Sequence, residues 1–480
     1  MSVILVALFC ALMLVYRLRR PRYPPLPPGP PADPFIGHLR IAPTSDFGIS
    51  FYNMGKTYGN LMHLNIFGRI TVVVNSVRVA AELMEKRRSS SKYNDRALLR
   101  VFRIMGWTEN LAFIPYGRTF QRHRRMFKEA FNKKASLNHR PVQLFEARVL
   151  AKNLMKEPDN WAKLLTRFST AVILRIVHGH HVVSEYDPLV KLAEEEGWAL
   201  TQLGSVGANL LDVFPFLQYM PSWFPGTHYA QFAREHYPKV REMYELPLRD
   251  VLERMAQGTA AESVMASQLS ALHREGDRVG YTVEDIKGVA ATSYIAGAET
   301  TASTLFSFML AMVLHPECQL RAQAELDRVV GTNRLPEFDD RPSLPYLECL
   351  LQETFRWNHP LPTGVPHRVT ADDVYDGMFI PEGSIIIPNI RGMTWDESLY
   401  ADPFTFDPTR FLPMPEGRNE PFSGATWGFG RRVCPGRHLA DASLWIAIAM
   451  LLSTVQISKA VDEDGNEIMP EVAFITSFTR

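Results

Sequence analysis

The stretch Trp427-Gly-Phe-Gly-Arg-Arg-Val-Cys-Pro-Gly436 places one thiol, that of Cys434, on a loop of glycines and a proline. Arginines flank the cysteine at positions 431, 432 and 437, and the apolar run 439–455 predicts a long helix directly after the loop. Positive charge and a helix N-terminus both lower the pKa of a cysteine, and only the thiolate is a nucleophile or a metal ligand. A packing cysteine needs neither the arginines nor the glycines, so we interpret Cys434 as a thiolate presented for chemistry.

The composition indicates one large domain. The chain has 480 residues, 46% of them hydrophobic, and past residue 31 no repeat, low-complexity stretch or Gly/Ser-rich linker divides it. The net charge of +1 argues against a general attraction to nucleic acid, so no nucleic-acid partner is expected. Four cysteines, at 10, 318, 349 and 434, are too few and too scattered for a disulfide framework and fit a reducing compartment.

The first 33 residues predict a membrane anchor and a hinge. An unbroken apolar run, 3–16, is followed by four arginines and by the proline-rich segment 24–31. A secretory signal peptide has its positive charge before the apolar run, whereas arginines after the run favour a cytosolic domain. We therefore expect a single N-terminal anchor at residues 1–20 and a basic, proline-rich hinge at 21–33 that acts as a stiff spacer. The run is shorter than the roughly 20 residues of a comfortable span, which favours a tilted or interfacial helix.

The rest of the chain predicts a mainly α fold with a minor β-sheet. Alternating β-branched residues at 61–67 and 70–74 predict two strands, and a second strand-rich patch covers 367–389, with turn signals at Asp376-Gly377 and Glu382-Gly383. Helical spacing of apolar residues dominates elsewhere, in segments 78–86, 118–130, 147–156, 161–177 and 229–256.

A long apolar helix is predicted over 283–314, because no proline interrupts it. Gly297 in its interior costs about 1 kcal/mol relative to alanine, which calls for close packing or a functional gap. Glu299 and Thr300 stand beside it, and together they could pass protons to a bound ligand through water. The alternative is a satisfied polar pair where two helices cross.

A structural ion pair is predicted on the helix 344–357. Glu353 and Arg356 are three residues apart and therefore share a face. Apolar neighbours favour burial of this face, where removal of either partner would leave an uncompensated charge. Arg410, in Asp407-Pro-Thr-Arg-Phe411, is a candidate second cation for the glutamate.

In this order, the motifs resemble those of the cytochrome P450 family, the haem-thiolate monooxygenases. The cysteine loop is similar to the family's haem-binding signature, 296–301 to its oxygen-activation motif, and Glu353 with Arg356 to its Glu-x-x-Arg pair. The resemblance covers nearly the whole chain and implies the cytochrome P450 fold, as a single haem domain over 34–480. The end of the loop and the region 95–98 resemble fungal membrane-bound members of the O-methylsterigmatocystin oxidoreductase type.

The resemblance implies haem b, iron protoporphyrin IX, as the cofactor. Cys434 would be the axial thiolate and the metal ligand, on a loop shaped by Trp427, Gly430 and Gly436. The haem propionates would be held by charge-assisted hydrogen bonds from Arg124, Arg432, Arg368 and His367. The buried network of Glu353, Arg356 and Arg410 would fix the segment that leads to the cysteine.

The distal side of the haem would be formed by the long helix. Gly297 would leave room for dioxygen, and Thr300 with Glu299 would organise the water that delivers protons. By analogy, the substrate pocket would be lined by Met105, Phe113, Leu210, Tyr294, Ala298, Val365 and Phe474.

The implied activity is insertion of one oxygen atom of dioxygen into a lipophilic small molecule, a secondary metabolite or xenobiotic, with electrons from NADPH. NADPH-cytochrome P450 reductase would dock on arginines near Cys434 and on the helix that carries 122–128. The domain would face the cytosol from the endoplasmic reticulum membrane. The alternatives are a reductase-independent haem-thiolate isomerase or dehydratase, against which Glu299 and Thr300 speak, and a non-catalytic haem-binding protein.

Three features depart from the family pattern. Phe120 stands where many members have a tryptophan that donates its indole N–H to a propionate. Trp427 stands where a phenylalanine usually packs beside the thiolate, and a shifted iron redox potential is expected because the surroundings of the sulfur tune it. The chain stops at Arg480, soon after a segment that normally turns back to add a strand and a substrate-facing loop, which keeps the non-catalytic alternative open.

Overall fold

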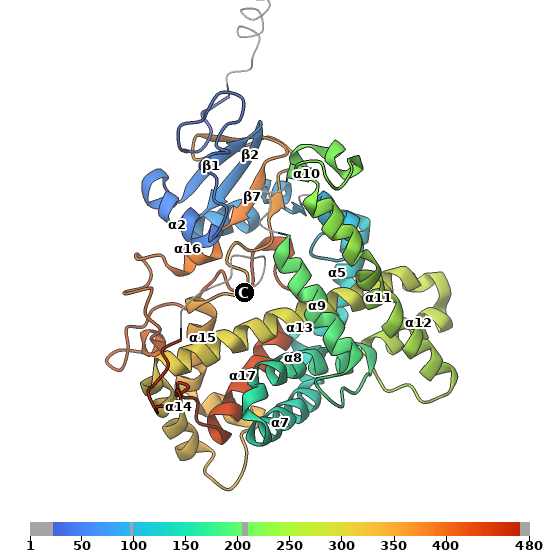
Figure 1. The fold of residues 1–480 in the computed structure, drawn as a ribbon, viewed down its shortest axis with the longest axis vertical. Helices are drawn as coiled ribbons and strands as arrows, with labels where there is room; N and C mark the ends of the chain where they lie inside the picture. Colours follow the sequence, from blue (N-terminus) through green and yellow to red (C-terminus); the bar gives the residue numbers. More distant parts are fainter. Residues whose placement is uncertain (1–22, 97–98, 204–209, 471–480) are drawn as a thin grey trace, which may run out of the picture.

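Helix α13 (Val283–Leu314) runs through the middle of the helical part of the molecule in the computed structural model, which describes residues 23–96, 99–203 and 210–470 (Figure 1). Its bounds confirm the predicted helix. The helix begins at a capping box, in which the Thr282 hydroxyl accepts from the Asp285 N–H and the Asp285 carboxylate accepts from the Thr282 N–H at 2.8 Å. It packs on α8 (Trp161–His178) and also contacts α5 (Arg118–Phe131), α9 (Pro188–Gln202), α11 (His228–Ala256), α15 (Pro345–Trp357) and α17 (Arg437–Thr454).

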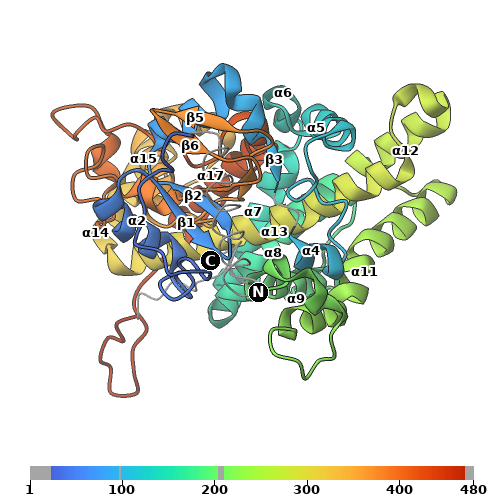
Figure 2. The same cartoon turned by 90° about the horizontal axis from the view of Figure 1, so that it is seen from above.

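The helical periodicity predicted most of these helices. Two other predicted helical segments differ from the structure in their bounds. Helix α7 (Arg140–Lys156) begins seven residues before the predicted segment 147–156. The predicted helix 78–86 is divided into α3 (Val77–Ala81) and a π-helical turn (Glu82–Lys86). Seen from above, the strands lie on one side of the molecule, and α11 and α12 (Val264–Glu275) extend from the opposite side (Figure 2).

A five-stranded sheet confirms the predicted minor sheet. Its order is β1 (Leu61–Ile66), β2 (Arg69–Val74), β7 (Ile385–Pro388), β4 (His367–Arg368) and β3 (Asp95–Arg96), and all neighbours are antiparallel except β2 and β7. A separate hairpin, β5 (Asp373–Tyr375) and β6 (Met378–Ile380), turns at Asp376-Gly377, where both residues have positive φ, 48° and 73°. The register pairs Arg96 of β3 with His367 of β4, which places both at the edge of the site described below.

The proline-rich segment packs on the domain, which corrects the expectation of a stiff spacer for the part that begins at Tyr23. The His63 ring donates to the Pro27 carbonyl at 2.6 Å, and the Phe379 N–H donates to the Pro25 carbonyl at 2.7 Å. The Tyr23 ring stacks on the Phe379 ring with centroids 4.1 Å apart. The predicted anchor lies outside the described residues. Among the described helices, only α13 is long and apolar enough to cross a membrane, and it is mostly buried in the protein.

Candidate active site

A cavity of about 290 Å³ lies between α13 and the cysteine loop. Cys434 and its neighbours form one wall, and α13 contributes Ala296, Gly297, Thr300, Thr301 and Thr304 to the other. Most of the remaining wall is apolar and comes from distant segments, including Phe120, Phe127, Val172, Ile173, Leu361 and Ile390. The thiol and the long helix therefore face the same cavity.

The cysteine loop is held in shape by its own backbone. The Cys434 N–H donates to the Trp427 carbonyl at 2.8 Å. Gly430 has a φ of 60°, and a Cβ there would collide with the Met84 carbonyl oxygen, so only glycine fits. The Gly430 N–H donates to the Glu85 carboxylate at 2.7 Å. Gly436 differs, because its backbone is unstrained and a Cβ would meet open space. Its N–H group instead interacts with the Cys434 thiol.

Burial raises the pKa of the Cys434 thiol, and the N–H of Gly436 and the charges of Arg124 and Arg437 only partly offset this rise. The sequence-based argument that the flanking arginines give a net lowering of the pKa is therefore wrong. Among those arginines, Arg432 donates to the backbone carbonyls of Asn94, Leu111 and Ile114 and is not among the charges that act on the thiol. A buried thiol with a raised pKa is a poor free nucleophile, whereas a coordinating metal ion deprotonates a thiol outright. The environment thus favours metal ligation over nucleophilic attack.

Three arginines, Arg96, Arg124 and Arg432, line the same cavity, and the first and last also donate to backbone carbonyls. Burial lowers the pKa of all three, that of Arg432 to about 10. Within the described part of the chain, no aspartate or glutamate lines this cavity. Cations in a cavity wall that holds no carboxylate favour an anionic ligand, and carboxylates accept charge-assisted hydrogen bonds from arginine. The two propionates of haem b fit this requirement, with the thiol of Cys434 as the iron ligand.

The sequence analysis did not identify Arg96 as a residue of the cavity wall, and it expected Arg368 there instead. Arg368 forms an ion pair with Asp95 at 2.5 Å, has 46% of its side chain exposed and is absent from the cavity wall. His367 does line the cavity, with Nδ1–H donating to the Tyr93 carbonyl at 2.6 Å and burial holding its pKa well below 6.5. Consecutive residues of a strand point to opposite faces, so only one of His367 and Arg368 can face the cavity.

Arg96→Ala is expected to speed haem loss about tenfold, because a hydrogen bond to a charged group is worth about 1.5–3 kcal/mol. Transfer of haem from the loaded protein to an excess of apomyoglobin measures this rate. Arg368→Gln is the matched control and should leave the rate unchanged. Equal rates of haem loss in the two variants would contradict the assignment of Arg96 to the cofactor.

Phe120 and Trp427 occupy the two positions where this chain departs from the family pattern. The Phe120 ring lies under the Arg432 guanidinium, 3.8 Å from its centre, so it supports a propionate-facing arginine by a cation–π contact. The Trp427 ring lies in the cavity wall and meets the Phe355 ring edge-on, with centroids 5.2 Å apart. The redox potential expected from Trp427 stays a prediction.

On the distal side, Gly297 and Thr300 line the cavity and Glu299 does not. A Cβ on Gly297 would lie 3.0 Å from Ile173 Cγ1 of α8, so close packing of the two helices is one reason for the glycine, and its role toward dioxygen stays a prediction. The Thr300 hydroxyl donates to the Ala296 carbonyl at 2.8 Å. The buried Glu299 turns its carboxylate towards Gly197 of α9. Thr300 therefore lies on the cavity side of α13, and Glu299 lies on the side that faces α9.

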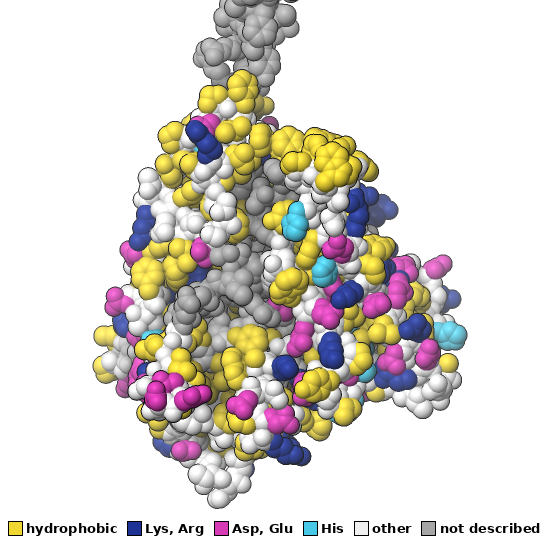
Figure 3. All heavy atoms as spheres, in the orientation of Figure 1, with side chains coloured by type: hydrophobic (Ala, Val, Ile, Leu, Met, Phe, Trp, Pro, Cys, Tyr) yellow, Lys and Arg dark blue, Asp and Glu magenta, His cyan; other side chains and the backbone are white. Residues whose placement is uncertain are grey.

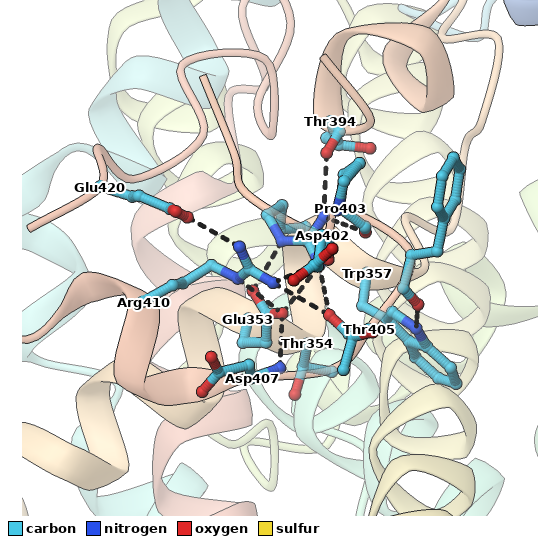
Figure 4. A network of polar contacts seen from close by, with 12 residues as sticks. Glu353, Thr354, Trp357, Thr394, Asp402, Pro403, Thr405, Asp407, Arg410 and Glu420 are labelled. Atoms are coloured by element: carbon cyan, nitrogen blue, oxygen red, sulfur yellow. Dashed lines mark hydrogen bonds and ion pairs between the residues drawn. The ribbon is translucent and has the colours of Figure 1, made fainter. Parts of the chain in front are cut away.

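The structure brings Glu353, Arg356 and Arg410 into one fully buried network (Figure 4). Arg356 donates from Nε and Nη2 to the two Glu353 oxygens, each at 2.7 Å, and Arg410 Nε donates to Oε1 at 3.0 Å. Both arginines also donate to backbone carbonyls, those of Thr394, Pro403, Ala401, Asp402 and Thr405. These bonds tie α15 to the segment 394–420, which leads to the cysteine loop.

The predicted substrate-lining residues are mostly elsewhere. Val365 lines the cavity, whereas Met105, Tyr294 and Ala298 are buried in the core outside its wall, and Phe113 stacks on Phe102 with ring centroids 4.2 Å apart. The Tyr294 hydroxyl donates to the Leu189 carbonyl of α9. The side chain of Leu210 and the whole of Phe474 lie outside what the structure describes.

Comparison with known proteins identifies the family. The family model named Cytochrome P450 matches residues 27–477. Cytochrome P450 monooxygenase 136 of Postia placenta is 38% identical over 472 residues, which cover 97% of this chain and 89% of that protein. Cytochrome P450 monooxygenase claR of Ampulloclitocybe clavipes is 38% identical over 446 residues, 91% of this chain and 81% of that protein. The family binds haem b through a cysteine thiolate. The chain, in which the Cys434 thiol faces the cavity opposite α13, thus belongs to the cytochrome P450 family of monooxygenases.

Proposed function

We propose that this monooxygenase hydroxylates a neutral, lipophilic small molecule with electrons from NADPH. Substrate, dioxygen, NADPH and one proton would give the hydroxylated product, water and NADP⁺. The observation that carries the proposal is the cavity wall, which is mainly apolar and in which the described residues supply no carboxylate. A cationic substrate would have no counter-ion there, and an anionic one would compete with the propionates for the three arginines.

Bound haem supplies the activation of dioxygen, and the chain supplies the surroundings. Cys434 would supply the thiolate ligand, and Arg96, Arg124 and Arg432 would hold the propionates. Thr300 presents a hydroxyl to the cavity, and its oxygen can accept a hydrogen bond from a water molecule there. The apolar wall orients the substrate and limits the entry of water.

Labelled dioxygen tests the proposed reaction. Haem-loaded protein, a membrane reductase, NADPH and ¹⁸O₂ are incubated with a panel of neutral terpenoid and aromatic compounds. We expect a product that carries one ¹⁸O atom and whose formation requires NADPH. Conversion of a compound without dioxygen and NADPH would support the isomerase or dehydratase instead.

We propose NADPH-cytochrome P450 reductase as the electron donor. Exposed cations lie on α5, on α6 (Lys133–Leu137) and on the cysteine loop: Arg118, Arg125, Lys128, Lys133, Lys134 and Arg431. Arg122 is less available, because it forms an ion pair with Asp285 at 2.9 Å. This surface suits the acidic flavin domain of a reductase.

High salt is expected to slow the first reduction of the haem by about tenfold, because ions screen the attraction between the two proteins. Stopped-flow formation of the ferrous carbon-monoxide complex measures the rate. Lys128→Glu should slow reduction at low salt, and Lys56→Glu, on α2 (Phe47–Tyr58), should not. A rate independent of salt would contradict the electrostatic docking.

We propose the endoplasmic reticulum membrane as the location, with the domain on its cytosolic side. Hydrophobic side chains gather at the end of the molecule near the first described residues and the segment after α10 (Leu210–Val213) (Figure 3). Phe35 there is 97% exposed, and Tyr219 and Trp223 are each 79% exposed. Aromatic side chains favour the membrane interface, so this surface supports a second contact besides the anchor.

Protein without residues 1–22 is therefore expected to bind phosphatidylcholine vesicles still. Replacing Tyr219 and Trp223 by serine should weaken this binding about tenfold or more, because each buried aromatic contributes about 1.5–3 kcal/mol. Flotation of the vesicles measures the bound fraction. Equal binding of the truncated protein with and without the substitutions would contradict this surface contact.

A further inference from the structure

Helix α9 contacts α13 at two points. Near its start, the Leu189 carbonyl accepts from the Tyr294 hydroxyl. Eight residues later, Gly197 lies against Glu299, and a Cβ built on this glycine would be 2.5 Å from Glu299 Oε2 and 3.2 Å from Cδ. All of the nearest atoms belong to Glu299. The absence of a side chain at position 197 thus leaves the space that the carboxylate occupies.

Backbone geometry does not explain this glycine. Gly197 lies in the interior of α9 and is not among the glycines with positive φ. A helix-interior glycine is less stable than alanine by about 1 kcal/mol, so a compensating role is expected. The neighbouring Glu196 is fully buried and accepts from His236 Nδ1 of α11 at 2.9 Å, which holds α9 on its other side. Because α9 is held between two helices, a larger residue at 197 would move the Glu299 side chain rather than α9.

We propose that Gly197 is a positioning residue for Glu299, which keeps the carboxylate on the α9 side of the cavity wall. The inference rests on the proposed monooxygenase reaction, and it takes Glu299 and Thr300 as the residues that deliver protons to the cavity. Thr300 follows Glu299 in α13 and lines the cavity, so protons from Glu299 would reach the cavity past this neighbour, through bound water. Displacing the carboxylate would lengthen that transfer, and catalysis by a positioned acid or base depends on such distances.

Gly197→Ala tests the inference without removing a catalytic group. The crowded atom is at the end of a flexible side chain, and alanine favours the helix, so the unfolding temperature should not fall. NADPH-driven oxygen consumption with reductase should slow about tenfold, since proton transfer by a positioned group contributes 10² to 10⁴-fold. Its solvent deuterium isotope effect should rise, because proton transfer becomes rate-limiting. The rate of first reduction should be unchanged.

Rescue by a shorter acid separates positioning from general packing. Glu299→Asp in the Gly197→Ala background removes one methylene and makes room for the new methyl group. Oxygen consumption should recover about threefold or more relative to Gly197→Ala, as expected for coupled rather than additive neighbours. Gly55→Ala is the control, because a Cβ there crowds the Asn75 side chain in a different part of the fold. Glu299→Asp should not rescue it.

A second readout needs no haem. In thermal unfolding, Gly197→Ala should be more stabilising in the Glu299→Asp background than in the wild type. Additive effects on unfolding, or an unchanged rate and isotope effect in Gly197→Ala, would overturn the inference. A protein that never forms a ferrous carbon-monoxide complex would instead contradict the proposed function, and the unfolding cycle would still decide whether Gly197 positions Glu299.

Discussion

Glu353→Gln is expected to lower the free energy of unfolding by about 3–5 kcal/mol and to leave little haem-loaded protein. Among the described residues, Glu353 is the only acid that forms an ion pair with Arg356. Arg410 forms ion pairs with both Glu353 and Glu420. All three side chains of the network are fully buried. The amide would leave the Arg356 charge uncompensated where water cannot reach it, and chemical denaturation measures the loss.

Glu348→Gln on the same helix is the control for this experiment. The Glu348 carboxylate accepts from Arg341 at 2.9 Å, but both side chains are partly exposed. Such a pair is worth about 0–1 kcal/mol, so the substitution should change stability little. Similar losses of unfolding free energy in the two variants would mean that burial does not determine how much the Glu353 network contributes to stability.

Cys434→Ala is expected to abolish monooxygenase activity, a loss of about a thousandfold or more for a group required in bond cleavage. The substitution removes the thiol that faces the cavity and leaves the Cys434 N–H bond to Trp427 available to alanine. The fold should therefore survive, which far-ultraviolet circular dichroism can verify. Activity is measured with reductase, NADPH and a compound that the wild type oxidises.

Cys349→Ala provides the matched control for the thiol. Cys349 is buried in α15, and burial raises its pKa to about 11, as expected of a packing cysteine. Its replacement should lower stability modestly and leave activity and haem binding intact. If haem binding and activity were lost in Cys349→Ala and kept in Cys434→Ala, the assignment of Cys434 as the iron ligand would be wrong.

Local patterns were enough to predict the parts of the molecule that depend on nearby residues. The apolar run and the next proline bounded α13, and the spacing of Glu353 and Arg356 placed them on one face of α15. Glycines around Cys434 indicated a tight loop, and the structure assigns a steric reason to Gly430.

Features set by contacts between distant segments could not be predicted in this way. Arg96 reaches the cavity because a two-residue strand pairs with His367, far along the chain. Burial, a property of the whole fold, reverses the expected shift in the pKa of Cys434. The space that the Glu299 carboxylate occupies depends on the absence of a side chain at Gly197 of α9. The role of haem came from the resemblance of the motifs and from the relatives.

The reduced carbon-monoxide difference spectrum tests the central claim most directly, that Cys434 is the thiolate ligand of haem iron in a cytochrome P450. The account predicts a Soret band at the long wavelength typical of thiolate ligation in the wild type, and its loss in Cys434→Ala but not in Cys349→Ala. A well-folded, haem-loaded wild type whose band lies at the shorter wavelength typical of histidine ligation would contradict the account.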